Sequence, residues 1–249
     1  MKGLTEYAQT VLEELAKLGL SSMFLFGDAR YRHDKLAGEA KSKNADYIES
    51  ASRNLGIYQL TRSVDLYNWY CREVLKLAVK SNPDEVIATL EAVDGPIKKN
   101  ITRARKDGGI PGPEIVEGLY HRRNVMDGHV RRAVHEHLHV FENPETKVLC
   151  ACRNCLVHKR GNDSDRGIAD ALNEIGDARA LIYPTNWPAG HLPIQLSAEN
   201  ELIIDSEIGR WAVDLISNQI HLMDQNFAAL HKLPTTRWRP RPFSHVVTA

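Results

Sequence analysis

The chain has 249 residues, 43% hydrophobic and 26% charged, so it can bury a substantial core without crosslinks or metals. Its 32 Lys and Arg balance its 32 Asp and Glu, which excludes an overall basic field and leaves any nucleic-acid function to local patches. Neither a secretory leader nor a run of about 20 apolar residues is present, so we expect a cytoplasmic protein without a membrane span.

The first hundred residues predict three helices. Apolar residues recur at helical spacing in residues 4–19 and predict a first helix that ends near the glycine at position 19. Residues 28–48 are polar and mixed and give no clear pattern. A second apolar stripe over residues 60–78 predicts a helix that stops where residues 81–83, Ser-Asn-Pro, begin a shorter third one. That third helix is expected to end at residues 94–96, Asp-Gly-Pro.

Proline and glycine punctuate the next segment. After a Gly and Pro run, Pro113 is suited to the first position of a long helix that extends to Phe141. Asn143 before Pro144 predicts a new helix that runs to about Arg160 and is closed by a turn. A short helix is expected over residues 166–178.

One hairpin precedes the last predicted helix. Residues 192–197 and 201–205 read as strands on either side of a short turn. The last helix begins near Ser206, and residues 235–249 are expected to form an extended tail. The pattern predicts an all-α helical bundle with one small β-hairpin before the last helix, in a single domain over residues 1–234.

The most informative stretch lies between Ala151 and Gly161. Arg153 and His158 are separated by four residues, and Asn154 directly follows the arginine. This pattern resembles the signature of the HEPN superfamily, in which an Arg and a His stand four to six residues apart, commonly with a polar residue after the Arg. The glycine three residues after the histidine also fits many members of that family.

The resemblance implies a HEPN-type bundle with its core at about residues 113–232, and the N-terminal helices packed on it. It also implies a homodimer that acts on RNA, a metal-independent endoribonuclease in a toxin, antiviral-defence or stress setting, and a partner such as an antitoxin or a nucleotidyltransferase. The alternative within the family is a non-catalytic module that binds RNA, a nucleotide or a partner. No cofactor or metal is expected.

The chemistry can be argued from the side chains. Cleavage of RNA by its own 2′-hydroxyl needs proton transfer, which suits His158, and cationic donors to the phosphate, which suit Arg153. Asn154 could orient a phosphate or the imidazole. Five helical positions turn by about 500°, so Arg153 and His158 point about 140° apart. They converge only if the helix is distorted, ends near His158, or meets a second copy.

Basic neighbours are candidates for substrate binding. Lys159 and Arg160 follow the motif, while Arg122 and Arg123 lie in a segment from residue 97 to 132 with nine basic and four acidic residues. Such a run is also typical of a solvated helix face. In the same way, Arg153 could be a simple ion-pair partner and His158 a cation near the negative end of its helix.

Other clusters have structural interpretations beside functional ones. Three cysteines and His158 offer a zinc ligand set, but four ligands within nine residues of one helix cannot face one point, and apolar packing is the alternative (Cys150, Cys152, Cys155). Three alternating histidines fan around a predicted helix, where they are expected to be exposed or interfacial, with metal binding as the functional alternative (His135, His137, His139). A polar and aromatic cluster fits roles in packing and at the surface (Asp65, Asn68, Trp69, Tyr70, Arg72). Trp69 or Arg72 could instead line the cleft that the resemblance implies between the motifs of the two copies. The tail residues Trp238 to Arg241 could contact RNA, but a disordered terminus is the favoured interpretation.

Overall fold

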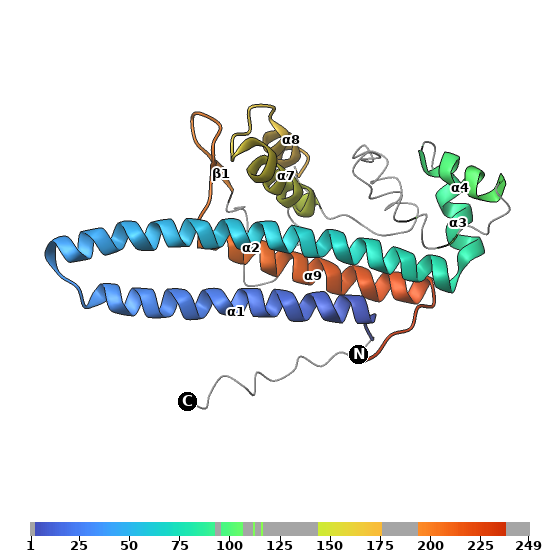
Figure 1. Cartoon of the computed structure of the whole chain (residues 1–249), viewed down its shortest axis with the longest axis horizontal. Helices are drawn as coiled ribbons and strands as arrows, with labels where there is room; N and C mark the ends of the chain where they lie inside the picture. Colours follow the sequence, from blue (N-terminus) through green and yellow to red (C-terminus); the bar gives the residue numbers. More distant parts are fainter. Residues whose placement is uncertain are drawn as a thin grey trace. The chain divides into compact units, whose positions relative to one another are not determined.

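The computed structural model describes residues 3–92, 96–106, 112, 116, 144–175 and 194–237. Its described residues are mostly helical, with helices α1 (Glu6–Asp34), α2 (Gly38–Ser81), α3 (Pro83–Ala92), α4 (Pro96–Lys106), α7 (Pro144–Lys159), α8 (Gly167–Asn173) and α9 (Ser206–Leu230). Strands β1 (Gln195–Leu196) and β2 (Leu202–Ile203) form an antiparallel hairpin before α9. The predicted all-α fold with a small hairpin before the last helix is therefore confirmed (Figure 1).

Other predictions from the sequence either lie outside the described residues or differ from the structure. The long helix from Pro113 lies outside the described residues apart from Val116, and the three alternating histidines and the tail from Trp238 onward lie wholly outside them. The predicted end of the first helix near Gly19 is wrong, because α1 continues to Asp34. Residues 28–48, which showed no pattern, form the end of α1 and the beginning of α2.

The chain divides into two compact units. The first takes its described residues from Met1–Glu13, Asn68–Phe141 and Ile220–Ala249, and the second from Glu14–Tyr67 and Glu142–Gln219. Helices α1, α2 and α9 each contribute residues to both units. No described helix has the length and apolar character needed to cross a membrane.

A buried carboxylate organises the first unit. Asp224 accepts hydrogen bonds from the backbone N–H of Thr5 (2.7 Å), the hydroxyl of Thr5 (2.6 Å) and the hydroxyl of Tyr70 (3.0 Å). The Thr5 hydroxyl also accepts a hydrogen bond from the backbone N–H of Ala8, so Thr5 is the N-cap residue of α1. The carboxylate thus fixes the start of α1 against α2 and α9 within this unit.

The N-terminal residues of the first unit also pair with the segment after α9. Leu4 and Thr236 form an antiparallel bridge through two backbone hydrogen bonds of 3.0 and 2.9 Å. The Gln9 amide donates to the backbone carbonyl of Leu4 (3.0 Å) and to the hydroxyl of Thr236 (2.6 Å). The start of the predicted tail is therefore extended, and it is held by this bridge.

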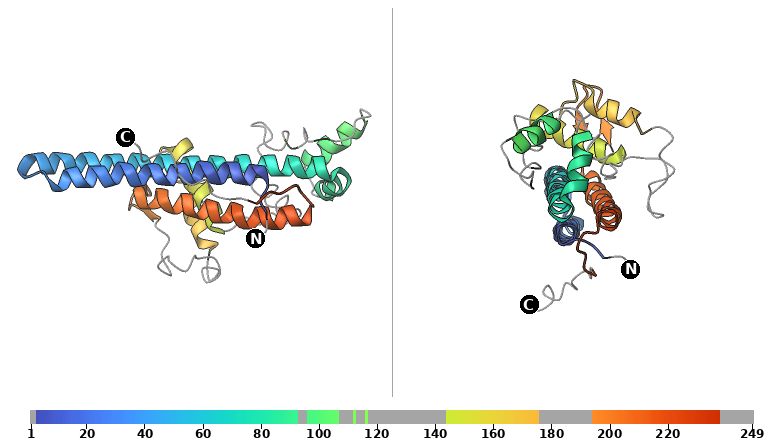
Figure 2. Two further views of the ribbon diagram at one scale, coloured as in Figure 1. Left: turned by 90° about the horizontal axis from the view of Figure 1, so that it is seen from below. Right: turned by 90° about the vertical axis from the view of Figure 1, so that its right-hand side faces the viewer.

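In the second unit, α1 and the first part of α2 run antiparallel, side by side (Figures 1 and 2). The Gln59 amide donates to the carbonyl of Leu18 across this pair (3.1 Å). Helix α9 meets α2 at Gly56 and Gly209, where a Cβ on Gly209 would lie 2.8 Å from the Gly56 Cα. Two glycines are required because any side chain would force the helices apart.

Candidate functional site

Helix α7 carries the Arg and His motif and has one buried side. It begins at Pro144, as predicted, and Val148, Cys152 and Cys155 are buried at spacings of four and three residues. This spacing places all three on one side of the helix. Asn154 and His158, one turn apart from each other, are exposed. The motif therefore combines buried packing residues with polar groups at the surface.

An ion pair holds Arg153. Its Nε and Nη2 atoms donate to the same carboxylate oxygen of Asp65 on α2, at 3.2 and 3.0 Å. Its Nη1 donates to the side-chain oxygen of Asn154 at 3.3 Å. The exposed fraction is 26% for the Arg153 side chain and 46% for that of Asp65. The guanidinium is thus oriented by one residue on α2 and one on its own helix.

His158 occupies the last turn of α7. Asn154 and His158 are four positions apart and point within about 40° of each other, whereas Arg153 and His158 differ by about 140°. Helix α7 is continuous through both and ends at Lys159, one residue beyond the histidine. The helix thus ends near His158, but the described hydrogen bonds of Arg153 lead to Asp65 and Asn154, so the convergence of Arg153 and His158 stays a prediction. A contribution from a second copy stays a prediction.

The end of α7 is closed by two residues in the left-handed backbone region. Arg160 has φ 54° and Gly161 has φ 91°. The N–H of Gly161 donates to the carbonyl of Cys155 (3.1 Å), and its own carbonyl accepts from the N–H of Leu202 on β2 (2.8 Å). The hairpin before α9 thus fixes the turn that follows His158.

The candidate substrate-binding residues have different environments. Lys159 forms an ion pair with Asp165, while Arg160 is exposed. Arg122 and Arg123 lie outside the described residues. Among the described candidates, Arg160 is the cation most open to solvent beside the motif.

The structural interpretations of the motif and of the cysteines also have support. Arg153 is an ion-pair partner and His158 lies near the negative end of its helix, as the non-functional interpretation predicts. The cysteines of α7 are buried, and burial raises the pKa of the Cys152 and Cys155 thiols. In the described part of the chain, no three His, Cys, Asp or Glu side chains are grouped to hold a metal ion.

Asp65 is the site residue that sequence reasoning missed. The sequence places Asp65 in a polar and aromatic cluster and favours its neighbours Trp69 and Arg72 for the site. In the structure, Trp69 contacts the ring of Tyr7 edge-on and Arg72 pairs with the adjacent Glu73. The amphipathic pattern marks Asp65 as a surface position and contains no signal for a partner 88 residues away. Its role becomes visible only when α7 is placed beside α2.

Comparisons with known proteins give no relative for this chain: no family model, curated protein or solved structure matches it.

Proposed function

We propose that this chain is a metal-independent endoribonuclease of HEPN type, with Arg153, Asn154 and His158 as its active residues. The observation that carries the proposal is the arrangement on α7: Asn154 and His158 are exposed one turn apart, beside a guanidinium that Asp65 orients. We infer a toxin, antiviral-defence or stress role, with an antitoxin or nucleotidyltransferase as partner, from the motif resemblance alone.

The proposed reaction is transesterification within the RNA. The 2′-oxygen attacks the adjacent phosphorus, the bond from phosphorus to the 5′-oxygen breaks, and the products are a 2′,3′-cyclic phosphate and a 5′-hydroxyl. His158 takes the proton from the 2′-hydroxyl or supplies one to the leaving 5′-oxygen, and water exchanges the other proton, so one proton is released and one is consumed. Either role suits an imidazole near neutral pH.

Arg153 would stabilise the negative charge on the phosphorane. A guanidinium has five N–H donors, and three of them are used in the described hydrogen bonds to Asp65 and Asn154. The two remaining donors would face phosphate oxygens, for which the planar guanidinium is well matched. Asp65 acts in this scheme as a positioning residue.

The proposal includes a homodimer. Arg153 and His158 diverge by about 140° on a continuous helix, so one copy presents them to different directions. A second α7 related by a two-fold axis would bring the histidine of one copy toward the arginine of the other. The proposal requires this dimer in solution, which sedimentation of the purified chain would measure.

The test is cleavage of RNA in the presence of a chelator, followed by analysis of the product ends. We expect cyclic phosphate ends, and we expect His158→Ala to lower the rate by roughly 10²–10⁴-fold with little change in RNA affinity. Val157→Ala is the matched control, because Val157 precedes the histidine and is 51% exposed.

Other results would distinguish the proposed enzyme from an RNA-binding module, a metal-dependent nuclease and a protein without an RNA function. RNA binding without cleavage in the wild type, lost on Arg153→Ala, would replace the enzyme by a binding module. Cleavage that disappears with the chelator would contradict the metal-independent reaction. A wild-type chain that neither binds nor cleaves varied RNAs would leave only the structural roles of Arg153 and His158.

A further inference from the structure

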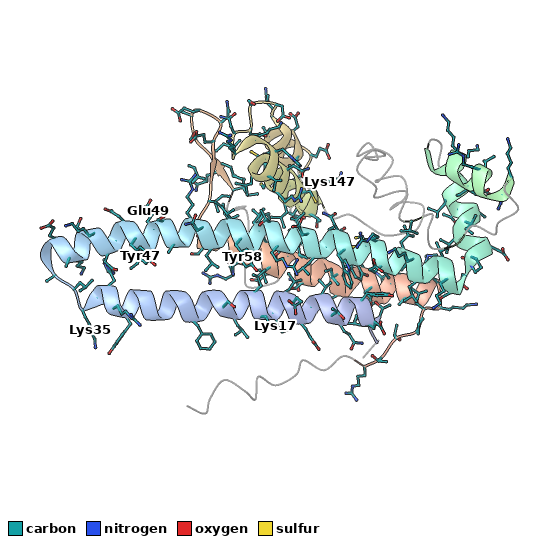
Figure 3. The ribbon with its side chains drawn as sticks, viewed as in Figure 1. Lys17, Lys35, Tyr47, Glu49, Tyr58 and Lys147 are labelled. Carbon is teal, nitrogen blue, oxygen red and sulfur yellow. The ribbon has the colours of Figure 1, made fainter. Side chains whose placement is uncertain are left out.

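One face of α2 carries exposed aromatic side chains, and the same face includes Asp65 at the candidate site. Tyr47 is 71% exposed and Tyr58 is 57% exposed, and Figure 3 labels both on α2. At about 100° per residue, Tyr47, Asn54, Tyr58 and Asp65 point within about 20° of one direction. Asp65 is the residue that holds Arg153. The two tyrosines therefore lie on the same face as the anchor of the site.

The charges on this face favour an anionic partner. Within about 60° of the same direction lie the exposed cations Lys43 and Arg62, and the acid there is Asp65, which Arg153 already neutralises. Lys43 also pairs with Glu39 at 2.7 Å, but both side chains are about four-fifths exposed, so water screens that pair. The face combines cations with aromatic rings that are open to solvent.

We propose that this face, defined by Tyr47, Asn54, Tyr58 and Arg62, is a track that binds single-stranded RNA and leads it to Arg153; this inference rests on the proposed function. Exposed aromatic rings stack on any base, and neighbouring cations follow the phosphates. From position 47 to position 65 the helix rises about 27 Å, the length of on the order of eight stacked nucleotides at about 3.4 Å each.

The composition of the track fits a nucleic-acid strand better than a second helix. A helix that pairs with another copy needs a continuous apolar stripe at heptad spacing. Here the polar residues Asn54 and Arg62 stand between and beside the tyrosines. Single-stranded RNA can bind to separate aromatic rings with polar residues between them, because its bases stack on the rings and its charged backbone contacts the polar residues.

The experiment uses the full chain and a fluorescent 12-nucleotide oligoadenylate with 2′-O-methyl groups, which blocks cleavage. Binding is measured by anisotropy with chelator present. We expect Tyr47→Ala with Tyr58→Ala to weaken binding by about 25-fold or more, because loss of each stack costs on the order of 5-fold or more. The paired Phe variants keep the rings and should bind like wild type. Tyr31→Ala is the control, since Tyr31 is 60% exposed but lies on α1.

The outcomes separate the track from the proposed enzyme. Unchanged affinity of the double Ala variant, in a protein that still cleaves RNA, would overturn the track and leave the ribonuclease proposal standing. A wild type that neither binds the oligonucleotide nor cleaves RNA would overturn both. A double variant that changes from dimer to monomer in sedimentation would identify the face as a contact between copies and overturn the RNA track.

Discussion

The Arg153 guanidinium and the Asp65 carboxylate meet side-on, with two guanidinium nitrogens donating to one carboxylate oxygen at 3.2 and 3.0 Å. The contact joins α7 to α2 within the second unit. Because both side chains are partly exposed, the pair is screened by water and contributes little to folding. Its larger effect is on the direction of the guanidinium.

The first prediction concerns this orienting role. Asp65→Asn removes the charge that holds Arg153, and we expect RNA cleavage to slow by about 10-fold because the guanidinium loses its fixed direction. The free energy of unfolding should change by less than about 1 kcal/mol, as for other exposed pairs. Single-turnover rates and urea denaturation measure the two effects. Asp46→Asn, an exposed aspartate on the same helix, is the control, and equal rates for both variants would remove the positioning role.

The second prediction separates stability from binding at Arg160. A non-glycine residue at φ 54° is strained, so Arg160→Gly should raise the free energy of unfolding by about 0.5–1 kcal/mol. The same change removes an exposed cation beside the motif and should weaken RNA binding. Thermal unfolding should therefore show a more stable protein, and fluorescence anisotropy should show a lower affinity for RNA. A more stable variant with unchanged RNA affinity would show that Arg160 has a role only in the turn after α7 and does not bind RNA.

The third prediction tests the contact of α2 with the residues that begin α9, and uses a glycine of α1 in the same unit as the comparison. A Cβ on Gly56 would overlap the carbonyl oxygen of Asp205, so Gly56→Ala should destabilise the chain by about 1–3 kcal/mol. Among the described atoms, a Cβ on Gly19 would meet Val213 Cγ1 at an ordinary contact distance of 3.7 Å, so Gly19→Ala should stabilise the chain by about 0.5–1 kcal/mol. Similar melting temperatures for the two variants would contradict the close approach of the helices.

The fourth prediction is a pH dependence from Asp224. Burial raises the pKa of this carboxyl, although the hydrogen bonds from Thr5 and Tyr70 and the charge of His221 lower it. The folded chain therefore keeps a proton at pH values where the unfolded chain has lost it, from about pH 4 upward. Its contribution to stability is full below the unfolded pKa and is lost as the pH rises through the folded pKa, by up to about 1.4 kcal/mol per pH unit.

The measurement compares the wild type with Asp224→Asn by urea denaturation at several pH values between 4 and 8. The difference in unfolding free energy should shrink as the pH rises, because only the wild type carries this group. Carboxyls that do not act on Asp224 titrate equally in both proteins and cancel. Both proteins carry His221→Gln, because the charge of His221 acts on Asp224 and its effect would not cancel. A difference that is constant with pH would contradict the raised pKa.

The sequence predicted the elements that have a buried stripe or a clear cap. Helix α7 begins at its proline, and α9 begins at Ser206 after Asp205, whose carboxylate accepts from the N–H groups of Glu207 and Ile208. The hairpin before it also lies where expected. In these places local chemistry and burial agree, so a short stretch of sequence contains enough information.

The errors lie where helices extend beyond a buried core. Residues 39–50 of α2 are almost all exposed, and a helix with polar residues on every side has no apolar period to recognise. The glycine at position 19 suggested an end, but α1 continues through it. The Asp65 contact of the site could not be predicted either, because it depends on how two distant helices pack.

The buried cysteines of α7 provide a way to measure local opening of the helix that carries the motif. Cys150, Cys152 and Cys155 are all buried, and burial also raises the pKa of the Cys152 and Cys155 thiols, which makes these two react slowly. We therefore expect a thiol-reactive dye to modify the three cysteines only when α7 detaches. Cys71, buried in the first unit, gives an internal standard on the same molecule. Labelling rates followed residue by residue would therefore show whether the segment bearing Arg153 and His158 opens by itself or only when the whole chain unfolds.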